Sequence, residues 1–167
     1  MESVIYIVKH DHEGTMGLVI NRPSTILVRN ALAGHFDLPE FDDLVYVGGP
    51  VEPQALLILH NASELSGGDK PVVSEVYIGN SEHAFREVVE RAAQQDAALH
   101  FRIFCGCAGW APGQLENELA RGDWYTVPAC RDLIYHEDPY EMYDLTLHAV
   151  ADAHRVVPDT CPNPQWN

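Results

Sequence analysis

The segment Phe104–Trp124 constrains the fold of this chain more than any other. It begins with an apolar run, passes through closely spaced glycines, and ends with Leu115 and Leu119 one helical turn apart. This order predicts a strand, a tight glycine loop and an amphipathic helix over Pro112–Arg121, framed by a proline near its first turn and Gly122 just beyond its end. We expect the two leucines to face the core.

Short apolar runs between turn-forming residues predict that sheet dominates the first half of the chain. Val4–Val8 and Met16–Ile20 flank a polar connection and are expected to form a β-hairpin. Further strands are expected at residues 44–47, 55–60, 72–78, 99–104, 124–127 and 133–135. Helices are expected at residues 26–32, from residue 82, and from residue 138 to about residue 155. We expect one α+β domain over residues 1–157 and a loosely ordered tail over residues 158–167.

The strongly negative net charge disfavours some classes of binding partner. The chain has 167 residues and a formal net charge of −15, with 10 Lys and Arg residues in all. Nucleic-acid affinity depends mainly on basic side chains that neutralise phosphates, so direct nucleic-acid binding is disfavoured. No apolar run reaches the ~20 residues of a membrane span, and the first residues lack the pattern of a secretory signal. We expect a cytoplasmic protein that does not bind membranes.

The four cysteines, at 105, 107, 130 and 161, lack the paired spacing of a zinc site and are interpreted as free thiols. A thiolate near a helix N-terminus can be reactive, which makes Cys105 and Cys107 reactive-thiol candidates. Buried cysteines are more often small hydrophobic residues, and this alternative stays open. His10-x-His12 and the helical set Asp144, His148 and Asp152 lack metal-motif specificity, so no metal or other cofactor is expected.

The glycine loop and the helix after it form one candidate binding surface, because glycine lets a partner approach the backbone and a helix N-terminus favours anions. Two polar side chains one turn apart on the helix can reach the same cleft. The structural alternative is that the glycines make a turn, the tryptophan fills the core, and the polar pair ties the helix to a loop. These candidates are Gly109, Trp110, Gln114 and Glu118.

A second candidate set lies in the strand-rich first half. Arg22 can orient a carboxylate or phosphate, or it can form a structural salt bridge or bind loop carbonyls. The glycine pair before Val51 gives a sharp exit from a strand, for which a backbone turn is the leading interpretation. The histidine that ends an apolar strand can act as a base or be a hydrogen-bonded core residue. The candidates are Asn21, Arg22, Gly48, Gly49, Pro50 and His60.

Four separated motifs together resemble the YqgE/AlgH family of bacterial proteins. They are Gly17-Leu-Val-Ile-Asn-Arg-Pro23, Gly48-Gly-Pro-Val51, Leu59-His60 and the segment Phe104–Trp124. The resemblance implies a compact α+β fold with a branched, mixed and antiparallel β-sheet surrounded by helices, and it supplies no catalytic residue. The matching positions are Asn21, Arg22, Pro23, Gly48, Gly49, Pro50, His60, Gly106, Gly109, Trp110, Gln114, Leu115, Glu118 and Trp124.

The chain departs from that family in two ways. The family usually has a small residue at position 105 and tyrosine at position 107, so neither thiol can serve a chemistry common to the family. Relatives usually carry a further apolar strand before the equivalent of Ser3. Its absence leaves either an exposed sheet edge or a different closure, and an exposed edge would promote a homodimer.

We therefore expect a non-enzymatic binding or regulatory accessory protein, with a groove near Arg22, Gly48–Gly49 and Gly109–Glu118 that takes a protein partner or a small anionic ligand. One alternative is a thiol-dependent enzyme or redox protein that uses Cys105 or Cys107. Another is a transcriptional regulator, as some family members are labelled. The acidic charge favours indirect action for that role.

Overall fold

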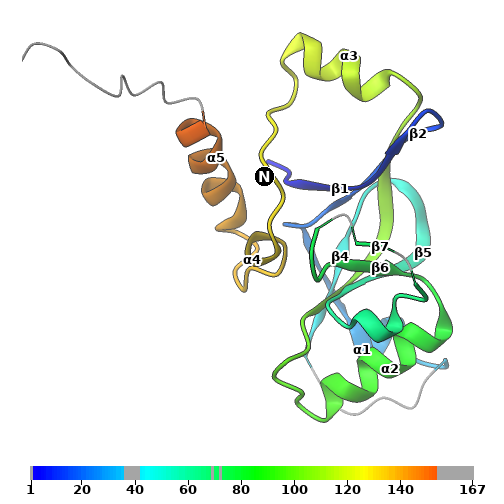
Figure 1. Cartoon of the computed structure of the whole chain (residues 1–167). Helices are drawn as coiled ribbons and strands as arrows, with labels where there is room; N and C mark the ends of the chain where they lie inside the picture. Colours follow the sequence, from blue (N-terminus) through cyan, green and yellow to red (C-terminus); the bar gives the residue numbers. More distant parts are fainter. Residues whose placement is uncertain (1, 36–41, 69, 72, 154–167) are drawn as a thin grey trace, which may run out of the picture.

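The computed structural model describes residues 2–35, 42–68, 70–71 and 73–153. They form a mixed β-sheet with helices on both sides (Figure 1). The strands are β1 (Ile5–Asp11), β2 (Gly14–Val19), β3 (Pro23–Leu27), β4 (Leu44–Val47), β5 (Val51–His60), β6 (Tyr77–Gly79) and β7 (Phe101–Trp110). The helices are α1 (Val28–Ala31), the 3₁₀ turn η1 (Ser63–Leu65), α2 (Glu82–Ala93), α3 (Gln114–Arg121), α4 (Arg131–Ile134) and α5 (Met142–Ala153).

The sheet branches around β7, its central strand. One path runs in the order β1-β2-β7-β4-β3, while β5 pairs with both β7 and β6. The first half of β7 lies between β4, which is parallel to it, and β5, which is antiparallel. The second half pairs with β2 as β4 ends. The predicted α+β fold with a branched sheet is confirmed, and so is the opening hairpin, in which β1 and β2 pair antiparallel.

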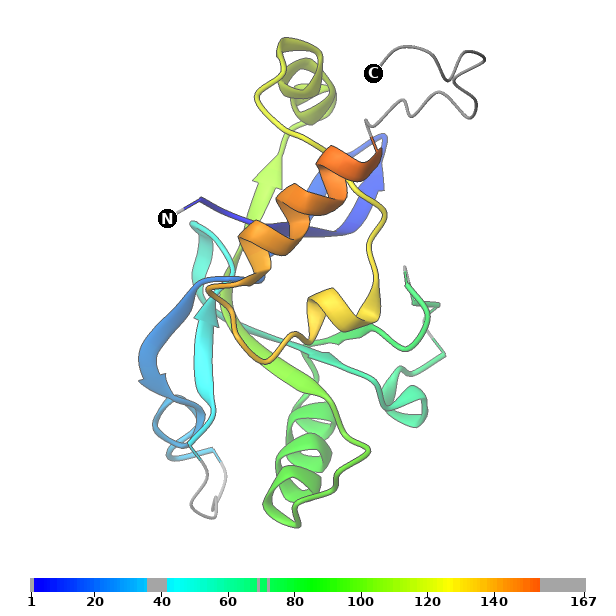
Figure 2. The ribbon, with the colours of Figure 1, turned by 90° about the vertical axis from the view of Figure 1, so that its left-hand side faces the viewer.

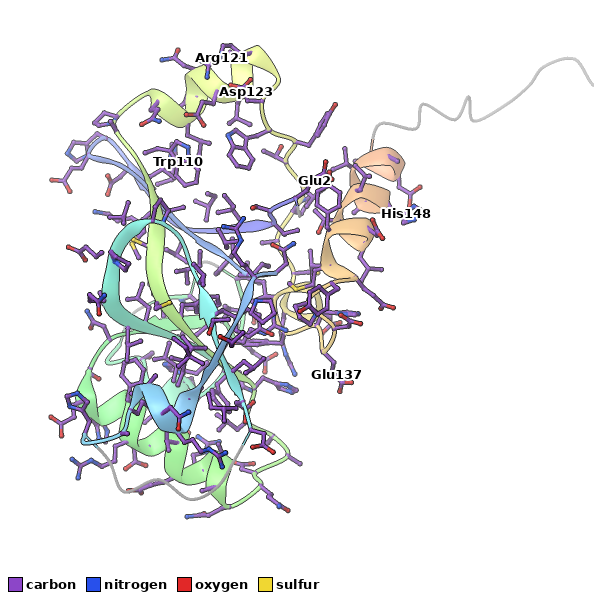
Figure 3. All side chains as sticks on the ribbon, turned by 180° about the vertical axis from the view of Figure 1, so that it is seen from behind. Glu2, Trp110, Arg121, Asp123, Glu137 and His148 are labelled. Atoms are coloured by element: carbon purple, nitrogen blue, oxygen red, sulfur yellow. The ribbon has the colours of Figure 1, made fainter. Side chains whose placement is uncertain are left out.

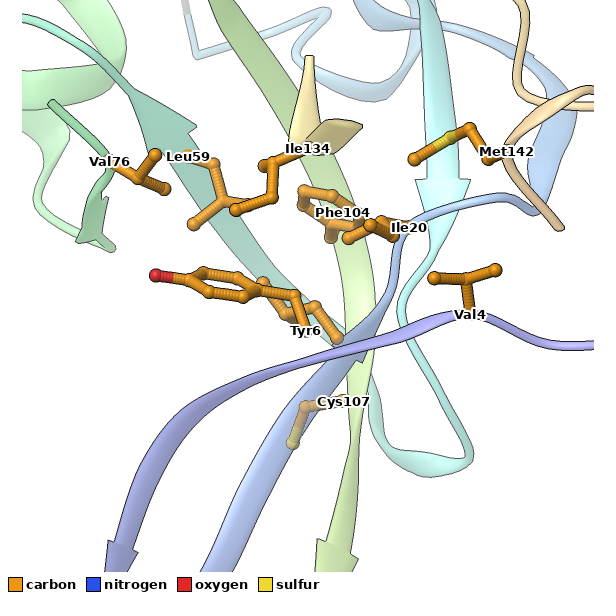
Figure 4. Close-up of a cluster of buried hydrophobic side chains, with 10 residues drawn as sticks. Val4, Tyr6, Ile20, Leu59, Val76, Phe104, Cys107, Ile134 and Met142 are labelled. Atoms are coloured by element: carbon orange, nitrogen blue, oxygen red, sulfur yellow. The ribbon is translucent and has the colours of Figure 1, made fainter. Parts of the chain in front are cut away.

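Two apolar clusters occupy the opposite faces of the sheet. The first lies between the sheet and the α4–α5 segment and contains Tyr6, Phe104 and Ile134 (Figure 4). The second lies under α1 and α2 and contains Phe85, Val88 and Ile103. Helix α2 forms as the periodicity predicts, and the Ser81 hydroxyl caps it by accepting a hydrogen bond from the Ala84 amide at 3.1 Å. Figure 2 shows α2 (green) at the lower end of the molecule and α5 (orange) higher up, in front of the sheet.

The connection from β4 to β5 crosses β7 with its backbone almost touching that strand. A Cβ atom on Gly49 would lie 2.3 Å from the Cys107 carbonyl, and one on Gly106 would lie 2.5 Å from the Gly49 oxygen. Gly106 also has φ +67°, a conformation that side chains other than glycine rarely adopt. Close backbone packing therefore accounts for these motif glycines.

Gly106 also changes which way the following side chains point. Successive residues of a strand normally alternate between the two faces, so Cys105 and Cys107 would share one face. Instead Cys105 packs against the cluster under α2, whereas Cys107 belongs to the cluster beside α4. The left-handed backbone at Gly106 turns the strand over at this point. The two thiols therefore lie on opposite faces of the sheet.

Several predicted elements differ from the structure. Most of the glycine loop expected between the strand ending at Phe104 and the helix beginning at Pro112 is a continuation of β7, because β2 pairs with it as far as Trp110 and β5 as far as Cys107. Residues 124–127 form no strand, and residues 131–134 form the helix α4, whose Ile134 is buried in the first cluster. The expected strand 72–78 is reduced to β6, and the expected helix 26–32 begins only at Val28, because pairing with β4 draws Pro23–Leu27 into the sheet.

Helix α3 does not pack on the core as expected. Its leucines, Leu115 and Leu119, are half-buried, and the helix lies beyond β1 and β2 at one end of the molecule (Figure 1). Helix α5 begins at Met142, after a turn in which the Asp138 carboxylate accepts a hydrogen bond from the Tyr140 amide at 2.8 Å. The predicted tail, residues 158–167, lies outside the described residues. In the described part of the chain, no helix is long and apolar enough to cross a membrane.

Candidate functional site

The residues predicted around α3 form a hydrogen-bonded cluster centred on Glu118. Its carboxylate accepts the indole N–H of Trp124 at 2.8 Å, the indole N–H of Trp110 at 2.9 Å and the amide of Gln114 at 2.9 Å. These bonds, with that of Trp124 the largest, lower the pKa of Glu118. The two indoles meet edge to face with their centroids 6.1 Å apart. Figure 3 shows Trp110 between the end of the sheet and α3.

This cluster ties α3 to the end of β7. Gln114 also accepts a hydrogen bond from the Ala111 amide at 3.1 Å, which fixes the turn before the helix. Gly109 lies within β7, paired with Met16, and is not part of a loop. The geometry therefore favours the tie between helix and neighbouring chain that the sequence left open.

Asn21 and Arg22 hold the beginning of the chain against the sheet. The buried Asn21 amide accepts the Val4 N–H and donates to the Glu2 carbonyl, both at 2.9 Å. The Arg22 side chain is exposed and donates to the Ser3 hydroxyl at 3.0 Å. Gly48 and Gly49 are buried against β7, and Pro50 beside them is exposed.

His60 is fully buried at the end of β5, where its ring stacks on Tyr77 with centroids 5.8 Å apart. Neither ring nitrogen makes a hydrogen bond of normal geometry within the described ranges. Burial lowers the pKa of His60, and the backbone of Ala62 opposes only part of that shift. The expected core position is therefore observed, without the expected hydrogen bond.

The cysteines and His60 do not form a nucleophile–base pair. His60 pairs with Phe101, four residues before Cys105 along β7, which corresponds to roughly 13 Å at the strand rise. Burial raises the pKa of Cys107, and the nearby Glu52 adds to this effect. A raised pKa disfavours the thiolate, the reactive form of the side chain.

The structure also reveals a site that the sequence analysis missed. A cavity of about 500 Å³ lies between the β3–β4 edge, the beginning of β7 and the chain joining α4 to α5, and we call it the Arg102 cavity. Its walls include Tyr46, Phe101, Tyr135 and Tyr140, and its polar residues include Asp43, His100, Arg102 and Glu137. A neighbouring cavity of about 430 Å³ shares His100, Tyr135 and Glu137 with it. None of the residues predicted for binding lines either of these cavities.

Arg102 is the buried arginine of the described chain, with 8% of its surface exposed. Its guanidinium donates to the carbonyls of Ile20, at 3.2 Å, and of His136, contacts the sulfur of Met142, and lies 4.8 Å from the Tyr46 ring centroid. Burial lowers the pKa of the guanidinium, but arginine keeps its charge in proteins. No carboxylate within the described residues forms an ion pair with it.

The charged groups at the rim of the cavity are acidic. Asp43 is accessible to solvent as a residue, yet the surrounding protein desolvates its carboxyl enough to raise its pKa, and Asp42 adds to the shift. Glu137 lies on the connection between α4 and α5, at the edge of the molecule (Figure 3). Neither carboxylate forms an ion pair or a side-chain hydrogen bond with another described residue. Across those same ranges, no three His, Cys, Asp or Glu side chains are grouped in a way that would hold a metal ion.

One signal in the sequence pointed to this site. Arg102 interrupts an otherwise apolar run, Phe101–Cys107, that begins within the strand expected at residues 99–104. A charge is rarely buried without a partner, so an arginine in a central strand marks an unusual site. The other walls come from segments far apart in the sequence, and no local spacing joins them.

Comparison with known proteins agrees with this fold. The AlgH-like family matches residues 1–154. A UPF0301 protein from Marinomonas sp. is 37% identical over 139 residues, covering 80% of this chain and 71% of that protein. A solution structure of the AlgH protein from Pseudomonas aeruginosa is similar with a TM-score of 0.70 and 31% identity, covering 89% of this chain and 79% of that one. A crystal structure of a protein from Corynebacterium diphtheriae has a TM-score of 0.57 and 25% identity, covering 78% of this chain and 68% of that one. The chain belongs to the AlgH-like family.

Proposed function

We propose that this AlgH-like chain is a cytoplasmic, non-enzymatic binding or regulatory accessory protein that holds a small anionic ligand in the Arg102 cavity. The observation that carries the proposal is the buried Arg102 guanidinium, which lines a cavity and has no ion-pair partner within the described residues. Burying a charge without a partner is unfavourable, and a bound carboxylate or phosphate would supply that partner. A volume of about 500 Å³ suits a small organic ligand.

The alternatives have less support from the geometry. A thiol enzyme needs a stabilised thiolate and a base within reach, whereas burial raises the pKa of Cys107 and His60 lies far along the sheet. Direct action on DNA is opposed by the net charge of −15. As a regulator the protein would therefore act indirectly, and ligand binding would change its affinity for a protein partner.

A second copy of the chain is the protein partner that one observation favours. β1 lies at the edge of the sheet, and an edge strand can pair with another chain. Native mass spectrometry at micromolar concentration tests this proposal. A dimer that is lost when Ile7 is replaced by proline would support pairing through β1, and a monomer at all concentrations would contradict it.

NMR titration of ¹⁵N-labelled protein with 3-phenylpropionate and with inorganic phosphate tests the anion site. We expect chemical-shift changes at the backbone amides of residues 99–103 and 135–138, which line the two cavities, and at the Arg102 Nε–H. Arg102→Gln should weaken binding at least about tenfold, because it removes the charge.

Arg22→Gln is the matched control, because it removes an exposed cation that the sequence favoured as an anion ligand. This variant should bind as the wild-type protein does. If neither anion shifts these signals at millimolar concentration, or if Arg22→Gln loses binding while Arg102→Gln keeps it, the assignment of the site to the Arg102 cavity is wrong.

A further inference from the structure

The Arg102 cavity carries unpaired charges of both signs. Its lining residues include the buried Arg102 together with Asp43 and Glu137, and neither of these two carboxylates forms an ion pair with a described cation. The guanidinium does not form an ion pair with either carboxylate. An anion alone would pair with the Arg102 guanidinium. The same anion would be repelled by the nearby carboxylates of Asp43 and Glu137.

Several other arginines of the described residues form ion pairs with carboxylates, unlike Arg102. Arg91 pairs with Glu64 at 2.6 Å and with Asp96 at 2.9 Å. Arg121 and Arg131 likewise contact carboxylates, and all three arginines are more exposed than Arg102. The most deeply buried arginine thus lacks the carboxylate partner that Arg91, Arg121 and Arg131 have. A ligand with a carboxylate would supply Arg102 with the ion-pair partner that it lacks.

The walls of the cavity suit an apolar body between the charged groups. Leu44, Tyr135, Pro139 and Tyr140 are among its lining residues. The Tyr46 ring is held against the guanidinium, 4.8 Å from its centre, so the charged and the aromatic surfaces adjoin. The cavity therefore offers a cationic group, an apolar wall and an acidic rim to one molecule.

From this arrangement we infer that the ligand is a small zwitterion with an apolar or aromatic body, such as an amino acid or a short peptide. Its carboxylate binds the Arg102 guanidinium, its ammonium group faces Asp43 and Glu137, and its side chain lies against the aromatic wall. This inference rests on the proposed anion site and adds the requirement for a positive group in the same ligand.

Three probes of matched size separate the contributions: L-phenylalanine, 3-phenylpropionate, which lacks the ammonium group, and L-phenylalaninamide, which lacks the carboxylate. Isothermal titration or NMR of the wild-type protein measures each dissociation constant. We expect L-phenylalanine to bind at least about tenfold more tightly than either other probe, because it alone pairs both charges.

The outcomes distinguish this inference from the proposal beneath it. If 3-phenylpropionate binds as tightly as L-phenylalanine, the zwitterion is wrong and the anion site stands. If L-phenylalaninamide binds most tightly, or if neither these probes nor inorganic phosphate bind at millimolar concentration, both are wrong.

Variants of the rim test the same point without touching the buried arginine. Asp43→Asn and Glu137→Gln should each reduce the advantage of L-phenylalanine over 3-phenylpropionate. The matched control is Asp42→Asn, which removes the same charge one residue away, where the carboxylate lies 3.9 Å from Arg29 and does not line the cavity. An equal loss in Asp42→Asn would show a general charge effect and overturn the assigned role of the rim.

Discussion

The two halves of β7 differ in their surroundings: one packs tightly against backbone, and the other borders a cavity. The second half, Cys105–Trp110, contains the glycine motif and lies against the β4–β5 connection so closely that side chains would collide with backbone. The first half, Phe101–Phe104, contains Arg102, whose side chain leaves the sheet and lines a cavity. The recognisable motif thus marks close packing, while the unpaired charge lies a few residues earlier. A motif that identifies a family need not be the place where its members bind.

The largest effect is expected where the motif packs most tightly. Gly106→Ala places a Cβ atom 2.5 Å from the Gly49 oxygen at φ +67°, so we expect the free energy of unfolding to fall by more than about 3 kcal/mol. Urea denaturation measures the change. Gly122→Ala is the control: its φ of +80° is similar but nothing lies within 4 Å, so a loss of about 1 kcal/mol is expected. Equal losses would show that crowding is not the cause.

Substitution in the first half of β7 should affect ligand binding strongly and the free energy of unfolding only slightly. Arg102→Met removes hydrogen bonds to two carbonyls but also removes the desolvation of a charge, so we expect the free energy of unfolding to change by less than about 1 kcal/mol. Binding of 3-phenylpropionate should nevertheless fall at least about tenfold. A loss of stability as large as that of Gly106→Ala would make both halves structural and remove the contrast.

Acid should destabilise the protein through His60, which pairs with Phe101 at the beginning of β7. Burial lowers the pKa of His60 in the folded state, so the unfolded state binds the proton more readily. The contribution of His60 is complete above an unfolded pKa near 6.5 and is lost as pH falls below it. Urea unfolding between pH 7.5 and pH 5 should show this slope. His60→Gln should flatten it, while the exposed His12→Gln should retain it.

The smallest effect is expected at the far end of the strand. Glu118→Gln weakens the bonds to Trp110 and Trp124, so we expect faster amide hydrogen exchange in α3. Global unfolding should change little, because α3 contributes no buried residue to either cluster. Gln114→Ala removes one donor to the carboxylate and also the bond from the Ala111 amide, so it should likewise increase exchange in the first turn of α3. If either variant lowered global stability as strongly as Gly106→Ala, α3 would belong to the cooperative core.

The sequence predicted those elements whose pattern is local. The opening hairpin and helix α2 follow from alternation and from apolar residues at helical spacing, and both formed as expected. The length of β7 could not be predicted from the local pattern. Pairing with β2 and β5 extends the strand through Gly106, where local preference predicts a turn. Residues 124–127 carry strand-forming side chains but find no neighbouring strand.

The candidate site was even less predictable from local sequence patterns than the secondary structure. The tie made by Gln114 and Glu118 was predictable, since the two residues lie one helical turn apart, whereas Trp110 was expected to fill the core and instead donates to Glu118. The Arg102 cavity was not, because its walls come from β3, β4, β7 and the α4–α5 connection, and only the folded sheet brings them together. What the sequence offered was a single charged residue in an apolar strand.

The reversal at Gly106 gives the protein two independent chemical reporters. Because Cys105 and Cys107 lie on opposite faces of the sheet, a thiol reagent that reaches Cys107 detects loosening of the layer beside α4 and α5. Cys105 is half-buried, so an increase in its reaction rate over that of the folded protein detects loosening of the layer under α1 and α2. Two sulfurs separated by one glycine can therefore record, residue by residue in a mass spectrum, which side of the molecule opens first.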